Sequence, residues 1–238
     1  METSDYPEQD GPNKTKRGTY RVALDVPWRV DGAADDPEAP VVLCLHGQWM
    51  EEDFFALLLQ KLHDLPFHFV TLRAPYPLKA PNENKIGASW YPYDGDRKRF
   101  LHELALTEGF ILGGLETVER ALGLAPRKRA LLGFSQGGYC GSFLALRHPD
   151  RFHGLIVSGA RVKTEALEDE MRAAAQSGMR ALLCHGTRDR SVPLEAAQRS
   201  ARGMNDAGVA TALLEFESGH SIGRNQVRAI GEWLEEWS

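Results

Sequence analysis

A serine flanked by glycines is the group in this sequence whose surroundings best suit chemistry. Ser135 lies in Gly133-Phe134-Ser135-Gln136-Gly137, between an apolar segment and a segment with helical spacing. The Gly-x-Ser-x-Gly pattern is typical of a sharp turn between a strand and a helix, where positions two before and two after the serine have almost no room for side chains. The hydroxyl then projects over the helix amino end, where partial positive charge favours a developing anion. The pattern predicts that Ser135 is a nucleophile.

A serine hydroxyl is a weak nucleophile at neutral pH and needs a general base. Where this turn is used, the chain order is serine, then acid, then histidine. Of the eight histidines, four follow Ser135. His148 lies in the helix after the serine, His153 comes just before the next apolar segment, and His185 precedes the best acid. His220 follows the last strand-like segment directly, so it alone satisfies order and placement, and we expect it to be the base.

Asp189 is the residue expected to orient the base. It lies in a loop after the apolar segment 180–185, and it falls between Ser135 and His220 in the chain. An aspartate in this position would hold the His220 ring in one tautomer and stabilise the imidazolium. The structural alternative is that Asp189 only caps the helix that begins after Pro193, and that His220 is a capping or surface histidine.

An oxyanion formed by attack at Ser135 needs two backbone N–H groups aimed at one point. One should belong to Gln136, the residue after the nucleophile. The other should come from the loop after the early strand, where Gln48 is the candidate. Gly47 lets that loop turn tightly, and His46 is interpreted as a loop-packing residue because it precedes the serine.

The elements that must position these groups alternate along the chain. Short apolar runs predict strands, and segments with helical spacing lie between them. The predicted strands are 41–45, 67–72, 129–134, 154–158, 180–185 and 210–216, with an edge strand within 19–30; the predicted helices are 51–63, 100–122, 137–147, 165–176, 194–205 and 225–237; the predicted loops are 31–40 and 74–97. Such alternation implies an α/β fold with a mostly parallel central sheet and helices on both faces. Chemistry in these sheets gathers at the carboxyl ends of the strands.

Composition limits the possible partners. The chain has 238 residues, 42% of them hydrophobic, and a formal net charge of −5, so it lacks the electrostatic footprint of a nucleic-acid-binding protein. No apolar run approaches the ~20 residues that a membrane span needs. The start lacks the apolar stretch of a secretory signal, and the three cysteines are not in metal-ligand spacing. We therefore expect a disordered lead-in over 1–18, a single domain over 19–238, a cytoplasmic location and no metal.

Five segments together resemble the carboxylesterase, phospholipase and acyl-protein thioesterase family of small α/β-hydrolases. They are Leu45-His46-Gly47, Ala74-Pro75 followed by Ser89-Trp90-Tyr91, Gly133 to Gly138, His185-Gly186 with Asp189 and Val192-Pro193, and Gly219-His220. The resemblance covers the chain from about Val41 to the carboxyl terminus. It implies the α/β-hydrolase fold and hydrolysis of a small-molecule ester or thioester through an acyl-enzyme, without metal or cofactor.

The sequence departs from that family after Gly47. The family commonly has a small, Gly- and Asp-containing segment where this chain has Gln48-Trp49-Met50. Two bulky residues beside the oxyanion hole predict a reshaped pocket and a smaller, or differently placed, acyl group. The predicted pocket residues are Trp49, Met50, Trp90, Tyr91 and Ile222, although loop aromatics often simply cover a core.

Two other functions stay open at this stage. The same three residues could act on another acyl bond, such as a lactone or an amide. The chain could also be a binding protein that keeps the fold without catalysis, although such proteins usually lose one of the three residues. The sequence leaves the oligomeric state undecided, and a homodimer is possible.

Overall fold

A computed structural model describes residues 18, 24–81, 85–93 and 95–238. The predicted lead-in over 1–18 lies outside the described residues except for Gly18. Residues 19–23 of the predicted edge strand lie outside them as well.

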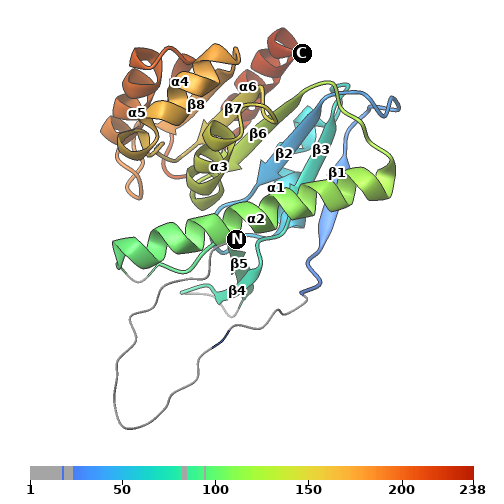
Figure 1. The fold of residues 1–238 in the computed structure, drawn as a ribbon, viewed down its shortest axis with the longest axis horizontal. Coiled ribbons are helices and arrows are strands. Elements are labelled where there is room, and N and C mark those ends of the chain that lie inside the picture. Colours follow the sequence, from blue (N-terminus) through green and yellow to red (C-terminus); the bar gives the residue numbers. More distant parts are fainter. Residues whose placement is uncertain (1–17, 19–23, 82–84, 94) are drawn as a thin grey trace.

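The predicted α/β architecture with a mostly parallel central sheet is confirmed (Figure 1). The strands run in the order β1-β3-β2-β6-β7-β8-β9. Their bounds are β1 Trp28–Asp31, β2 Val41–Leu45, β3 His68–Leu72, β6 Arg129–Phe134, β7 Gly154–Ser158, β8 Arg180–Gly186 and β9 Ala210–Phe216. Within the described part of this sheet, only β1 runs antiparallel to its neighbour. The strands β3, β2, β6, β7, β8 and β9 pair in parallel.

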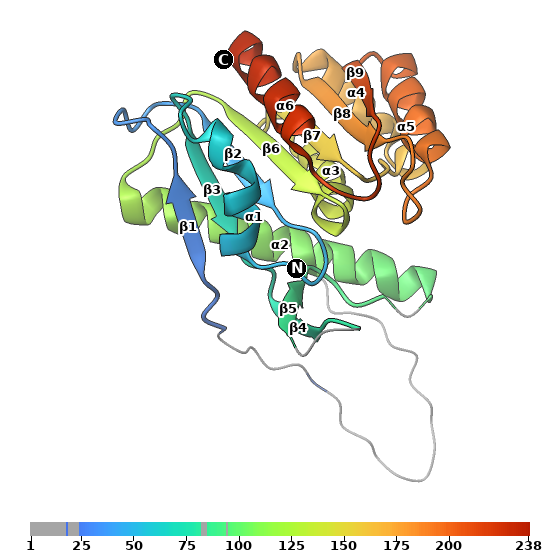
Figure 2. The same ribbon diagram turned by 180° about the vertical axis from the view of Figure 1, so that it is seen from behind.

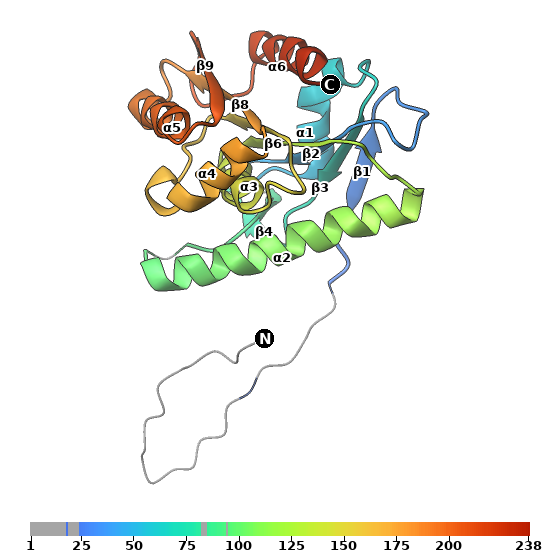
Figure 3. The same ribbon diagram turned by 45° about the horizontal axis from the view of Figure 1, so that its top comes forward.

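Helices cover both faces of the sheet, as predicted. Helices α1 and α6 lie together on the face seen from behind in Figure 2, and α2 to α5 lie on the other face (Figure 3). The bounds are α1 Glu52–Leu59, α2 Arg97–Leu122, α3 Gln136–Arg147, α4 Glu168–Gln176, α5 Leu194–Asp206 and α6 Arg224–Trp237, with short 3-10 turns η1 Gln60–Leu62 and η2 Thr164–Ala166.

The buried strands divide their side chains between the two faces. In β2 all five residues are buried. Leu43 packs with α2, α3 and α5 residues in one hydrophobic cluster, whereas its neighbour Cys44 packs with α1 and α6 residues in the other. Successive side chains of a strand point to opposite faces, so a strand covered on both faces must be apolar throughout. This is why continuous apolar runs predicted these strands correctly.

Two predicted segments differ from the structure. In the edge-strand segment 19–30, the described part is irregular up to Pro27, and β1 begins only at Trp28. Leu24 is exposed, so it does not belong to a half-buried strand face. The predicted loop 74–97 contains an antiparallel hairpin, β4 Tyr76–Lys79 and β5 Ile86–Ser89. The hairpin lies near the carboxyl ends of the central strands (Figure 1).

Candidate active site

Ser135 occupies the strained turn that its glycine neighbours predict. It lies between the end of β6 and the start of α3 with φ 52° and ψ −117°, a conformation that a residue with a side chain rarely adopts. A Cβ atom on Gly133 would lie 2.4 Å from the carbonyl oxygen of Gly137, and one on Gly137 would lie 2.2 Å from the carbonyl oxygen of Leu45. The two glycines therefore let the chain reverse direction while Ser135 projects outward.

Replacing Gly137 with alanine is expected to lower the free energy of unfolding by about 2 kcal/mol or more, because the new Cβ would overlap backbone rather than a movable side chain. Gly113→Ala is the matched control. Gly113 lies in α2, is exposed, and has no atom within 4 Å of a new Cβ, so alanine there should raise stability by about 1 kcal/mol. Urea unfolding of both variants measures the difference. Equal stabilities would contradict the close approach at the turn.

The three residues predicted for nucleophile, base and acid form one chain of hydrogen bonds. Nε2 of His220 lies 2.8 Å from Oγ of Ser135, and Nδ1 lies 2.7 Å from Oδ2 of Asp189. A carboxylate only accepts hydrogen bonds, so the neutral ring carries its proton on Nδ1 and presents the Nε2 lone pair to the serine hydroxyl. This is the arrangement in which a histidine can take the serine proton.

Neighbouring strand ends bring Asp189 and His220 together. Strands β8 and β9 pair in parallel, so the loops after both start at the same edge of the sheet. Thr187 N–H donates to the carbonyl of Phe216, and Arg188 N–H donates to that of Ser218. A Cβ on Gly186 would lie 2.4 Å from the carbonyl oxygen of Gly219, so glycine is required for this close contact.

The Asp189 carboxylate is anchored on both sides. Its side chain has no exposed surface, and its Oδ1 accepts hydrogen bonds from the backbone N–H groups of Ser191 and Val192 at 2.8 and 2.9 Å. Burial opposes ionisation of this carboxyl group, but the hydrogen bonds from Val192, His220 and Ser191 outweigh it and lower the pKa of Asp189. Asp189 therefore stays charged at neutral pH and holds its partner ring in place.

His185 supports the acid loop, a role the sequence did not predict. Its side chain is buried, its Nε2 lies 2.8 Å from the carbonyl oxygen of Val192, and the same nitrogen lies 3.5 Å from Oδ2 of Asp189. The carbonyl requires a donor, so the proton is on Nε2. His185 thus holds the loop that carries Asp189. The one feature of the sequence that could have indicated this role is its position four residues before Asp189.

The loop after β2 lies against the nucleophile turn. Gly137 packs against the carbonyl oxygens of Leu45 and His46. Within the described residues we find no protein acceptor for the backbone N–H of Gln48 or of Gln136.

His46 is a neutral packing residue, which agrees with its interpretation from the sequence. Ala74 N–H donates to its Nε2 at 3.0 Å, so Nδ1 carries the proton and lies 2.7 Å from the carbonyl oxygen of Gly47. Burial lowers the pKa of His46 to about 4. The ring therefore stays uncharged at neutral pH and ties the loop after β2 to the segment after β3.

A sequence profile of the phospholipase/carboxylesterase family matches residues 32–238. The chain belongs to the phospholipase/carboxylesterase family. The match spans the central sheet from β2 to β9 and the loops that meet at Ser135, and it confirms the family that the motifs indicated.

Solved structures of related proteins have the same fold. Esterase PE8 is 25% identical, with a TM-score of 0.73 over 91% of this chain and 100% of its own. Acyl-protein thioesterase 2 from Zea mays is 18% identical, with a TM-score of 0.70 over 88% and 98%. A carboxylesterase from Mesorhizobium loti is 21% identical, with a TM-score of 0.68 over 89% and 95%. These likenesses confirm the α/β-hydrolase fold.

The side chain of Gln136 joins the nucleophile turn of this family member to the hairpin. Its amide oxygen accepts a hydrogen bond from Trp90 N–H at 3.0 Å, and its amide nitrogen donates to the carbonyl of Tyr91 at 3.1 Å and to the hydroxyl of Ser89 at 2.9 Å. The sequence predicts a role only for the backbone N–H of Gln136. The partners lie more than 40 positions away, so no local pattern could reveal them.

Trp90 does not lie where a pocket residue should. The sequence predicted it as a pocket wall, but its side chain has no exposed surface, and its indole N–H donates to the carbonyl of His46 at 2.8 Å. The ring packs in the hydrophobic cluster that contains Leu43 and residues of α2, α3 and α5. It holds the loop after β2 through His46, and a side chain without exposed surface has no face to offer a substrate.

The other predicted pocket residues lie on segments that follow the carboxyl ends of strands. Trp49 is 40% exposed with φ 66°, and Met50 packs against the α1–α6 cluster. Ile222 is buried in that same cluster, two residues beyond His220. Tyr91 is nearly buried and lines a pocket beside the nucleophile turn. Trp49 therefore has the most surface available to a ligand.

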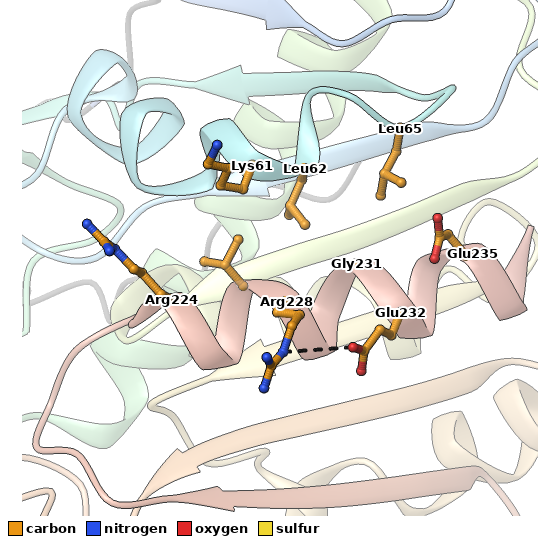
Figure 4. Close-up of a pocket in the computed structure, with 9 residues that line it drawn as sticks. Lys61, Leu62, Leu65, Arg224, Arg228, Gly231, Glu232 and Glu235 are labelled. Atoms are coloured by element: carbon orange, nitrogen blue, oxygen red, sulfur yellow. Dashed lines mark ion pairs between the residues drawn. The ribbon is translucent and has the colours of Figure 1, made fainter.

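A different pocket lies between η1 and α6 (Figure 4). Leu62, Leu65 and Val227 line its apolar part, and Arg228 pairs with Glu232 at its rim. It contains none of Ser135, Asp189 and His220. We assign it no role.

Within the described ranges no set of three or more His, Cys, Asp or Glu side chains is arranged to hold a metal ion. No helix of the described chain is long and apolar enough to cross a bilayer.

Proposed function

We propose that this protein hydrolyses carboxylic esters or thioesters of small molecules through an acyl-enzyme. The observation that carries the proposal is the continuous hydrogen-bonded chain from Ser135 through His220 to Asp189. Membership of the phospholipase/carboxylesterase family supports it.

In the proposed mechanism His220 takes the proton from the Ser135 hydroxyl as its oxygen attacks the acyl carbonyl. The carbonyl oxygen becomes an oxyanion and receives hydrogen bonds from the backbone N–H groups of Gln48 and Gln136. His220 then gives its proton to the departing alcohol or thiol, which leaves an acyl-serine. Water, activated by the same ring, attacks the acyl-serine and releases the acid. Asp189 stabilises the imidazolium in both steps.

We further propose that the acyl group is short. Trp49 follows the Gln48 donor directly, its backbone is held by hydrogen bonding to Ala88 of β5, and its large side chain projects at the surface. A bulky residue fixed beside the oxyanion site leaves less room for a long chain. Met50, Tyr91 and Ile222 are the other residues proposed to contact substrate.

A chain-length series tests this proposal. Among 4-nitrophenyl esters from acetate to dodecanoate, kcat/KM should be highest for the short acyl groups, and the thioester of the preferred acid should also be cleaved. Trp49→Ala should shift the optimum to longer chains, whereas the matched change Trp28→Ala, at an exposed residue on β1, should not. Preference for long chains would contradict the small pocket. No hydrolysis of any ester or thioester would contradict the proposed function itself.

We propose the cytoplasm as the compartment. Cys44, Cys140 and Cys184 are buried and free, and burial raises the pKa of each thiol, which keeps them as unreactive apolar side chains.

A further inference from the structure

A pocket of about 490 Å³ borders the nucleophile turn and combines aromatic walls with two cations. Its rings belong to Tyr91, Tyr93, Phe100 and Tyr139, whose neighbouring centroids lie 4.9 to 6.4 Å apart. We call it the aromatic pocket. Its size falls within the range of small-molecule sites, about 300–1,000 Å³.

The aromatic pocket is attached to the candidate active site through three elements. Tyr139 lies one helical turn after the nucleophile, and its N–H donates to the carbonyl of Ser135. Tyr91 is held by the Gln136 side chain. The segment after β7 packs on the start of α3, because a Cβ on Gly138 would lie 3.0 Å from that of Ala160. The aromatic pocket therefore lies about one helical turn from Ser135 and shares α3 and the Gln136 side chain with the candidate active site.

The cations of the pocket are fixed in place. Arg161 and Lys163 lie on the segment after β7, where they alternate with the buried residues Ala160 and Val162. Val162 N–H donates to the hydroxyl of Ser200 on α5 at 2.9 Å. The guanidinium of Arg161 lies 5.4 Å from the centre of the Tyr139 ring. Arg161 thus faces an aromatic wall, and Lys163 lines the same pocket, on an anchored backbone.

The pocket carries a net positive charge. Glu165 pairs with Arg161 at 3.0 Å and with Lys163 at 3.3 Å, so one carboxylate is shared between two cations. Burial opposes ionisation of Glu165, but hydrogen bonds from its own backbone N–H and from Arg161, together with the charge of Lys163, lower its pKa and keep it charged. The side chain of Lys163 is only 9% exposed, so little water compensates its ammonium group. Among the described residues that line the pocket, two cations and one carboxylate leave one positive charge in excess.

We propose that the aromatic pocket binds a carboxylate carried by the ester substrate, with Arg161 as its partner; this inference rests on the proposed function. A guanidinium suits a carboxylate because it can donate two parallel hydrogen bonds. The rings would pack the apolar part next to that carboxylate. A single excess positive charge matches a singly charged ligand. The substrate class is therefore an ester with a free carboxylate near the bond that is cleaved.

Two pairs of esters test the proposal and locate the charge. Hydrogen 4-nitrophenyl adipate and 4-nitrophenyl hexanoate differ by a carboxylate on the acyl side. 4-Acetoxybenzoate and its methyl ester differ by a carboxylate on the leaving-group side. In at least one pair the charged ester should have the higher kcat/KM relative to its neutral partner.

Two variants that change the charge of the aromatic pocket in opposite directions separate recognition of charge from packing. Arg161→Gln should lower the charged-to-neutral ratio of kcat/KM about 10-fold, which is typical for the loss of a hydrogen bond to a charged group. Glu165→Gln should raise the same ratio about threefold, because it releases both cations. Arg172→Gln on α4, a control that removes an exposed cation paired with Asp169, should leave the ratio unchanged.

A binding measurement keeps this test independent of hydrolysis. In ligand-observed NMR, 4-hydroxybenzoate and hexanoate should bind the wild type more tightly than 4-hydroxybenzamide, and Arg161→Gln should remove the difference. Hydrolysis of neutral esters without any charge preference, and with no effect of Arg161→Gln on carboxylate binding, would overturn the anion site and leave the proposed function standing. Carboxylate binding that depends on Arg161, without hydrolysis of any ester, would support the site and contradict the function.

Discussion

Ser135→Ala is expected to lower kcat for a short 4-nitrophenyl ester by about 10⁴–10⁶-fold, because no acyl-enzyme can form without the hydroxyl that lies 2.8 Å from His220. The fold should be unaffected. Alanine at this position keeps the backbone of the turn, and the lost hydroxyl is only half-buried. The assay is the release of nitrophenolate, with thermal unfolding measured in parallel.

Ser142→Ala provides the control for this result. Ser142 lies on the same helix, and its hydroxyl bonds to the carbonyl of Tyr139 rather than to the active-site histidine. Its kcat should stay close to that of the wild type. If Ser135→Ala kept hydrolysis at the wild-type rate while well folded, another residue would have to be the nucleophile.

Asp189→Asn is expected to lower kcat by about 10³–10⁴-fold, because it reverses the tautomer of the base. The Oδ1 atom of residue 189 must still accept the N–H groups of Ser191 and Val192, so the new amide nitrogen would face Nδ1 of His220. An amide nitrogen donates, and the ring would therefore carry its proton on Nε2. That proton would point at Ser135, and the ring could no longer accept the serine proton.

Steady-state kinetics of Asp189→Asn measures this effect. Asp169→Asn, at an exposed aspartate that pairs with Arg172 on α4, should have no effect on kcat. A loss of less than tenfold in Asp189→Asn would mean that the ring does not depend on this carboxylate for its tautomer, and that Asp189 only shapes the loop.

The sequence predicts the central sheet because local pattern and tertiary position agree there. A strand buried on both faces needs a continuous apolar run, and β2 is apolar throughout, while β6, β7 and β8 have apolar runs at 130–132, 155–157 and 181–184. The chain order of Ser135, Asp189 and His220 could be predicted for a related reason. Parallel strands bring their carboxyl ends to one edge, so each residue that follows a strand joins the same site.

Other features depend on contacts that no local pattern encodes. The backbone of the hairpin β4–β5 pairs with the loop after β2 at Trp49 and Ala88, and Trp90, which directly follows β5, is buried. Arg161 and Lys163 belong to no sequence motif. The aromatic rings of their pocket come from other parts of the chain, among them α3 and the segment after β5, so only the tertiary fold brings them together. The edge-strand prediction at 19–30 failed at Leu24 because alternation in an exposed segment resembles that of a half-buried strand.

The most direct test of the account is reaction of the purified protein with a fluorophosphonate probe, measured by intact mass. An activated serine attacks phosphorus and keeps the phosphonyl group, so we expect a single adduct on the wild type and none on Ser135→Ala. Absence of an adduct on a well-folded wild type, or an unchanged adduct on Ser135→Ala, would contradict the assignment of Ser135 as an activated nucleophile.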